Sequence, residues 1–140
     1  MSLVLGGFFV QMVLARAVHA LWWAPDLLTA ALVVSVTRQP ARWALASMTA
    51  GLCAIIWAVR APSMIALSYL ALGWGMRMAL RRWDVSDRRL QGVLAAVACA
   101  LLTGLAVWAD DLWSMPVAGW WLARAAATGA VVRWFPWPRG

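Results

Sequence analysis

The sequence predicts an all-α fold: a single integral membrane domain, residues 1–140, folded as a polytopic membrane helix bundle with six transmembrane helices. Hydrophobic residues make up 65% of the chain and charged residues 12%, whereas a soluble domain is about half apolar and about one quarter charged. Apolar segments recur along the chain at close to the length that a bilayer requires, roughly 20 residues per helix. The arginines gather in short breaks between these segments, as expected for membrane loops.

The stretch Arg77–Arg89 organises the predicted topology, because it is the most polar part of the chain and lies between two long apolar segments. Positive charge in short loops is retained on the cytoplasmic side of a membrane. We therefore predict a cytoplasmic basic loop, whose arginines are Arg77, Arg81, Arg82, Arg88 and Arg89.

The first two predicted spans differ in length. Residues 3–23 lack a basic leading region and are interrupted by Arg16 and His19, so we interpret them as a retained helix rather than a signal peptide. Residues 25–37 open with Pro25-Asp26, and both residue types favour a helix start. This second span is short for a bilayer. It is expected to cross a thinned membrane, to be shielded by its neighbours, or to be re-entrant.

Four further spans are each bounded by a polar turn, a proline or both. The third follows the basic break at 38–42, and the fourth opens with Pro62 just after Arg60. An acidic turn follows the fifth, and Pro116 opens the sixth. Tryptophans lie near most of these boundaries, where indole rings partition into the headgroup region. The predicted ranges are 43–59, 62–80, 90–109 and 116–134.

The charges fall on one side of this layout. With the N-terminus in the cytoplasm, only Arg60 among the loop arginines faces outward, whereas the cytoplasmic face also receives Arg38, Arg42, Arg133 and Arg139. This bias predicts cytoplasmic N- and C-termini. The formal net charge of +7 then indicates anionic lipid headgroups at the cytoplasmic loops. It does not indicate nucleic acid, because nucleic-acid-binding proteins gather basic residues on one soluble face.

Two arginines, Arg16 and Arg124, fall inside predicted spans. A guanidinium within a span costs at least about 2.5 kcal/mol on insertion scales, so it usually faces protein or finds a partner. We expect one of them to form an intramembrane ion pair. A contact with a partner protein and an anion or ligand site are the alternatives. The carboxylates within reach, at the outer helix ends, are Asp26, Asp110 and Asp111.

The sequence lacks the side chains of an enzyme, a metal centre or a cofactor site. Asp110-Asp111 resembles a magnesium-binding pair, but the chain has only 5 acidic residues to complete such a site. His19 has no second ligand at helical spacing, and no serine has a matching base within the spans. Cys53 and Cys99 lie in apolar surroundings without CxxC spacing, which is typical of small buried hydrophobes. We predict a protein that is not an enzyme and needs no cofactor.

Small residues recur at four-residue spacing, which lets helices approach closely in lipid. Such close packing is predicted at Ser47 and Gly51, at Ala96 and Ala100, and at Ala125 and Gly129. Gly73 and Gly75 flank Trp74 in the fourth span, and we expect close packing there together with a groove or a local bend.

Several motifs occur together between residues 25 and 102. They are Pro25-Asp26-Leu27-Leu28 after a first span, the basic break Arg38–Arg42, Thr49-Ala50-Gly51-Leu52, the short turn Arg60–Ser63 and the run LSYLALGWGMRMALRRW. In this part the chain resembles, as a divergent relative, the bacterial rod-shape-determining membrane protein family MreD. It departs from that family at Ile56-Trp57, where the family commonly has an acidic residue.

The resemblance implies a six-span fold similar to the substrate-capture S-components of ECF vitamin transporters. It also implies a scaffold in the bacterial inner membrane that binds the bitopic protein MreC and supports cell-wall elongation and cell shape. A small-molecule binding subunit of the ECF type is the first alternative, and it would need several convergent hydrogen-bonding groups in a pocket. An accessory helical subunit of a larger membrane complex is the second.

Overall fold

The computed structural model describes residues 1–17, 24–56, 60–83, 87–134 and 136. Over these residues the chain is a bundle of six α-helices with one short 3-10 turn and no strand, so the prediction of an all-α fold is confirmed for them. The elements are α1 (Ser2–Ala17), α2 (Leu27–Arg38), η1 (Pro40–Arg42), α3 (Trp43–Ile55), α4 (Pro62–Leu80), α5 (Arg88–Ala109) and α6 (Met115–Trp134).

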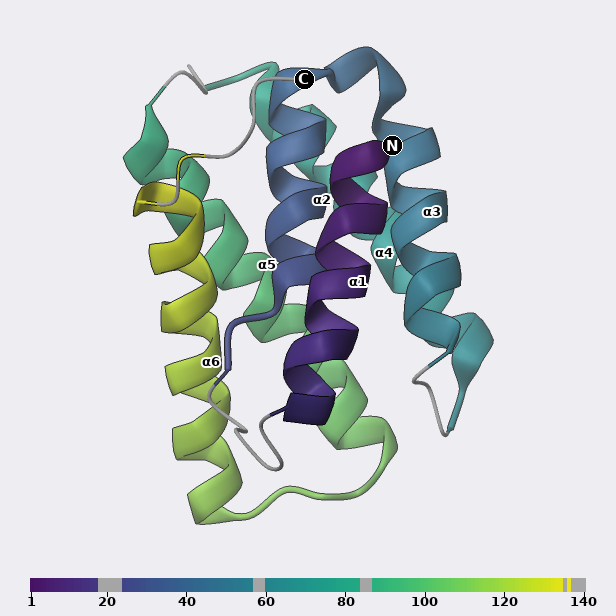
Figure 1. The fold of residues 1–140 in the computed structure, drawn as a ribbon, viewed down its shortest axis with the longest axis vertical. Helices are drawn as coiled ribbons and strands as arrows, with labels where there is room; N and C mark the ends of the chain where they lie inside the picture. The colour runs from purple at the N-terminus through teal and green to yellow at the C-terminus, as the bar shows by residue number, and fades with distance from the viewer. Residues whose placement is uncertain (18–23, 57–59, 84–86, 135, 137–140) are drawn as a thin grey trace.

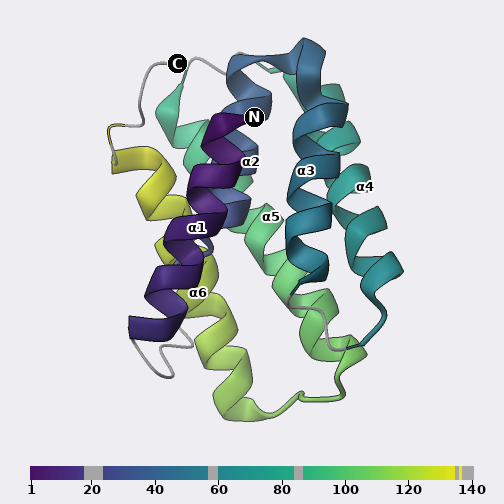
Figure 2. The same cartoon turned by 45° about the vertical axis from the view of Figure 1, so that its right-hand side comes forward.

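Helix α2 lies at the centre of the bundle and contacts each of the other five helices. The pairs α3–α4 and α5–α6 pack closely on two sides of it, and α1 lies across its front (Figures 1 and 2). The sequence of α2, LLTAALVVSVTR, is apolar on every face except at its end, and eight of its 12 residues are buried. A helix that is hydrophobic all round is buried among others, and this pattern explains the central position.

The central helix is too short to cross a bilayer by itself. Its 12 residues rise about 18 Å at about 1.5 Å per residue, against a hydrocarbon core of about 30 Å. Figure 1 shows it running from the end of the bundle that carries the N-terminus to a point partway along. Of the three possibilities for a short second span, the structure favours shielding by neighbouring helices.

Several helix bounds differ from those expected. The predicted loop is shorter, because Arg77 lies in the last turn of α4, and Arg88 and Arg89 lie in the first turn of α5. Asp87 explains the early start of α5: its carboxylate accepts a hydrogen bond from the Arg89 N–H at 2.8 Å, which caps the helix. Helix α6 starts one residue before the predicted span, and α4 matches its predicted range. The ends predicted at 23 and 59 lie outside the described residues.

Two of the described helices, α4 and α5, are long and apolar enough to cross a membrane. The others are shorter or less apolar, so six crossings stay a prediction. Large apolar side chains are nevertheless exposed on the surface of five helices, among them Phe9, Leu52, Leu67, Leu101 and Leu122. Exposed apolar surface of this extent marks contact with lipid or with another protein.

Small residues allow the backbones of α5 and α6 to meet. A methyl group added at Gly129 would lie 2.7 Å from the Gly92 carbonyl oxygen and 3.0 Å from the Ala96 Cβ. Ala125 is buried on the same face of α6. The same holds for α1 and α2, where a Cβ at Gly7 would lie 2.8 Å from the Leu27 carbonyl oxygen.

Helices α3 and α4 also pack closely at glycines, with one exception. A Cβ at Gly51 would lie 3.1 Å from the Ala66 carbonyl oxygen, and one at Gly73 would collide with the Ser47 hydroxyl. Gly75, by contrast, is exposed and has no atom within 4 Å of the Cβ position. The expected close packing at Gly75 is therefore absent among the described residues, and α4 continues through Gly73 and Gly75 as one helix.

We expect Gly129→Ala to destabilise the protein by about 1–3 kcal/mol, because the added methyl group overpacks a backbone contact. Gly119→Ala on the same helix is the matched control: its Cβ position is empty to 4 Å, so stability should hold or rise slightly. Thermal unfolding of both variants in detergent measures the difference. Equal stability of the two variants would contradict the close α5–α6 contact.

Candidate functional site

The buried start of α2 is the most polar place inside the bundle. Asp26 precedes the helix and is only 7% exposed. Its carboxylate accepts hydrogen bonds from the Thr29 backbone N–H at 3.1 Å and from the Thr29 hydroxyl at 2.7 Å. The first N–H groups of a helix have no partner within the helix, so an aspartate at this position satisfies one of them directly.

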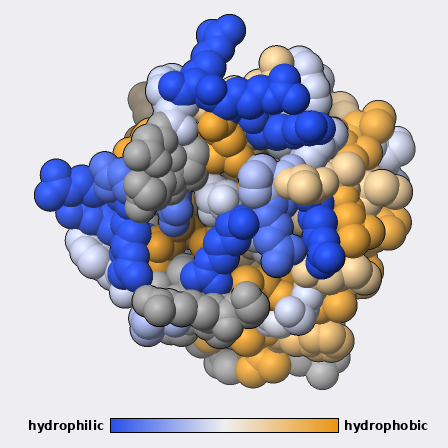
Figure 3. Space-filling model, turned by 90° about the horizontal axis from the view of Figure 1, so that it is seen from above, coloured by the Kyte–Doolittle hydropathy of each residue, from blue (hydrophilic) through white to orange (hydrophobic). Residues whose placement is uncertain are grey.

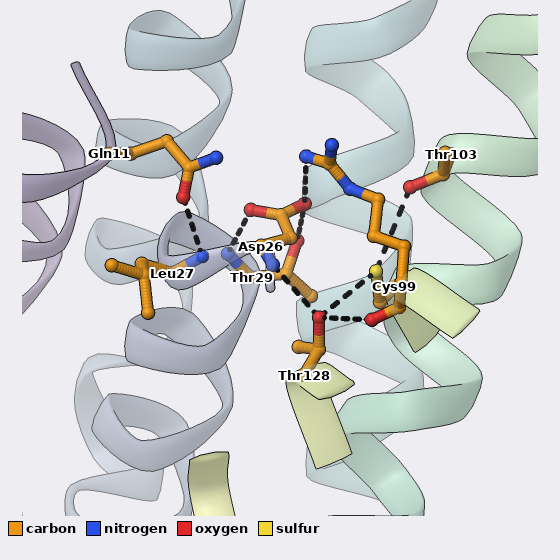
Figure 4. A network of polar contacts seen from close by, with 8 residues as sticks. Gln11, Asp26, Leu27, Thr29, Cys99, Thr103 and Thr128 are labelled. Atoms are coloured by element: carbon orange, nitrogen blue, oxygen red, sulfur yellow. Dashed lines mark hydrogen bonds and ion pairs between the residues drawn. The ribbon is translucent and has the colours of Figure 1, made fainter. Parts of the chain in front are cut away.

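Side chains from two other helices satisfy neighbouring N–H groups (Figure 4). The Leu27 N–H donates to the Gln11 amide oxygen of α1 at 2.8 Å, and the Asp26 N–H donates to the Thr128 hydroxyl of α6 at 2.9 Å. The start of α2 is thus held by α1 and α6 through side-chain hydrogen bonds to its first N–H groups.

Arg124 of α6 lies beside this network. Its Nη2 is 4.0 Å from the Asp26 Oδ2, which makes an ion pair longer than a hydrogen bond. The sequence predicted a pair between an intramembrane arginine and one of three aspartates, and the structure places Arg124 next to Asp26. The Nε of Arg124 is buried and has no hydrogen-bond partner among the described residues. At least one donor of this guanidinium, the Nε–H, is therefore unused within the part of the chain that the structure describes.

The network continues from α6 to α5. The Thr128 hydroxyl lies 2.8 Å from the Arg124 carbonyl oxygen and 3.4 Å from the Cys99 sulfur, and Thr103 lies 3.7 Å from the same sulfur. A hydroxyl carries one hydrogen, so Thr128 donates to one of these two groups at a time. Cys99 is a buried free thiol, as is Cys53 on α3.

A pocket of about 360 Å³ opens next to this network and is lined by all six helices. It lies at the end of α2 where the central helix begins. Tyr69 is 5% exposed, and its side chain interacts with Thr29. The lining residues are Gln11, Ala15, Asp26, Leu28, Ala54, Ile65, Tyr69, Leu102, Thr103, Ala106 and Arg124.

The opposite end of the bundle is basic. The α2–α3 and α4–α5 connections lie there (Figure 1), and Figure 3 shows hydrophilic residues gathered over this end. Arg77 lies 5.8 Å from the Trp43 ring, over its face, near the same end. A second pocket, of about 520 Å³, includes Ser35, Gln39 and two arginines in its lining. The exposed arginines of this end are Arg38, Arg42, Arg81, Arg82, Arg88 and Arg89.

The remaining predicted site residues are not brought into the network. Asp110 and Asp111 end α5, and within the described ranges neither forms an ion pair with an arginine. The backbone of Asp111 has a φ of 55°. Arg16 belongs to α1, but its side chain lies outside what the structure describes, and so does His19. No group of three potential metal ligands occurs among the described residues.

Sequence reasoning missed four members of the network: Gln11, Thr29, Thr103 and Thr128. Two signals were available. Gln11 is a lone amide in an otherwise apolar stretch, and Thr128 follows Arg124 by four residues, which places both on one helix face. Neither signal identifies the partner, because the partner lies on another helix.

Comparisons with protein-family models, with curated proteins and with solved structures found no match to this chain.

We expect Asp26→Ala to destabilise the protein by about 2–4 kcal/mol, because it removes a helix cap and leaves the Arg124 guanidinium without its counter-charge. Asp26→Asn keeps a cap and should cost less. Asp87→Ala, which removes an exposed cap at α5, is the control and should cost about 1 kcal/mol. Chemical unfolding in detergent ranks the three variants. If Asp26→Ala lowers the free energy of unfolding no more than Asp87→Ala does, the buried network contributes nothing to stability beyond helix capping.

Proposed function

We propose that this protein is a six-span bacterial inner-membrane scaffold, with cytoplasmic N- and C-termini, that binds another integral or bitopic membrane protein. The proposed role is non-enzymatic, and its proposed context is the cell-wall elongation machinery that maintains cell shape. The identity of the partner as an MreC-like protein rests on the resemblance of residues 25–102 to MreD. The binding role itself is supported by a feature of the lateral surface.

That feature is an apolar groove of about 540 Å³ between α4 and α5, the two helices that are long and apolar enough to cross a membrane. On α4 it presents Ala71, Gly75 and Ala79 at four-residue spacing. Small residues at this spacing let a second helix approach the backbone closely, which drives helix association in lipid. On α5 the groove wall is formed by Leu94, Val97, Ala98, Leu101, Leu102 and Leu105.

The basic end of the bundle supports the proposed orientation. Loop arginines are retained in the cytoplasm, and they can also attract the anionic lipid headgroups of the inner leaflet. The end with Asp110 and Asp111 would then face outward. The pocket at the start of α2 would open in the outer half of the membrane.

One observation favours the alternative of a small-molecule binding subunit. The pocket beside α2 gathers five polar side chains from five helices, which is more convergence than the sequence indicated. The pocket and the α4–α5 groove share only Leu102 among the residues that line them, so the two roles can be tested separately at residues that line one site alone.

Partner binding can be tested by filling the groove. We expect Gly75→Leu to lower recovery of the copurified partner at least tenfold in affinity purification with quantitative mass spectrometry, because the larger side chain prevents close helix approach. Gly6→Leu on α1 is the matched control, since Gly6 is likewise exposed and has an empty Cβ position. A partner retained by Gly75→Leu, or lost equally from both variants, would contradict the groove. An MreC-like partner would support the proposed context, and a different complex would favour an accessory subunit.

The orientation can be tested by single-cysteine labelling after both native cysteines are replaced by alanine. We expect Arg82→Cys to react with a membrane-impermeant maleimide only in lysed cells, and Leu112→Cys to react in intact cells, because the two exposed positions belong to opposite ends of the bundle. Labelling of Arg82→Cys from outside would overturn the layout.

A further inference from the structure

The pocket beside α2 has a surplus of hydrogen-bond donors. Arg124 contributes a guanidinium whose Nη2 lies 4.0 Å from the Asp26 carboxylate and whose buried Nε has no partner among the described residues. Gln11 uses its amide oxygen on the Leu27 N–H, so its two amide hydrogens remain available. In Figure 4 the Gln11 amide nitrogen points away from Leu27. Both side chains line the pocket.

The Asp26 carboxylate, the one carboxylate that lines the pocket, does not accept hydrogen bonds from these donors. Asp26 already accepts two hydrogen bonds from Thr29, at 3.1 and 2.7 Å, which fix its orientation toward the start of α2. Arg124 contacts it only at 4.0 Å. A guanidinium binds a carboxylate best through two parallel hydrogen bonds of about 2.7–2.9 Å, and that geometry is not used here. The arrangement therefore leaves room for a second acceptor group.

The rest of the pocket is apolar. Its wall includes Leu28, Ala54, Ile65 and Leu102, and its volume is about 360 Å³. At a liquid volume of about 30 Å³ per water molecule, this space holds about a dozen waters or a ligand of similar heavy-atom count. Ligand sites commonly combine such a wall with a few placed polar groups.

We propose that this pocket binds a small monocarboxylate with an apolar body. The carboxylate lies against Arg124 and the Gln11 amide, and the body lies against the wall formed by α2, α3, α4 and α5. Asp26 opposes the carboxylate by like charge and contributes to orienting Arg124. The inference goes beyond the scaffold role and does not depend on whether a partner helix occupies the α4–α5 groove.

The test uses the full chain in nanodiscs and 3-phenylpropanoate as the probe, with binding followed by isothermal titration calorimetry against empty nanodiscs. The neutral analogue 3-phenylpropanol and the cationic analogue 3-phenylpropylamine are the ligand controls. We expect saturable binding of the carboxylate and at least tenfold weaker binding of both analogues, because charge-assisted hydrogen bonds account for most of the recognition.

Variants at the pocket separate the proposed contacts. Arg124→Gln should weaken binding at least tenfold, whereas Arg133→Gln, an exposed arginine on the same helix, should leave it unchanged. Gln11→Glu keeps an acceptor for the Leu27 N–H but replaces two donors with a negative charge, so it should abolish binding. Asp26→Asn keeps a helix cap and removes the opposing charge, so it should tighten binding several-fold.

The Gln11 and Asp26 variants keep the inference testable even if Arg124→Gln fails to fold, because they are expected to change affinity in opposite directions. Absence of saturable binding by the wild-type protein would overturn the proposal. So would equal affinity for the alcohol, stronger binding of the amine, or full affinity in Gln11→Glu. None of these outcomes bears on partner capture, which is measured separately at Gly75.

Discussion

The structure depends on one constraint: a helix that begins inside a bundle must have its first N–H groups satisfied by protein. Helix α2 meets this constraint with its own cap, Asp26, and with side chains from α1 and α6 that reach across to Leu27 and Asp26. An unpaired buried amide costs about as much as a lost hydrogen bond. The first role of the polar groups at the start of α2 is therefore to stabilise a short helix that begins inside the bundle.

The same constraint produces the pocket. Because α2 begins partway along the bundle, a pocket opens beside its first turn, and the charged pair Arg124–Asp26 lies at the wall of that pocket. The structural role of Asp26 and a ligand-binding role of Arg124 are compatible. Asp26 is committed to Thr29, while the guanidinium retains free donors.

The lateral surface and the two ends of the bundle serve other purposes. Close glycine contacts, such as Gly92 with Gly129, hold α5 against α6, whereas the Cβ position of Gly75 on α4 has no described atom within 4 Å. A small residue that is exposed beside an apolar groove is available for another helix. The basic end, opposite the pocket, provides the charge asymmetry from which the proposed orientation follows.

Sequence alone determined the helical class, most helix bounds and the candidates for an intramembrane charge pair. The apolar segments, the prolines such as Pro62 and the arginine clusters are local signals, and they indicate where helices begin and end. Only the tertiary structure decided that Arg124 lies beside Asp26 and not beside Asp110. It also decided that Gln11 and Thr128 complete the network and that Gly75 stays exposed. These contacts join residues on different helices, and pairing between helices depends on packing that no local pattern encodes.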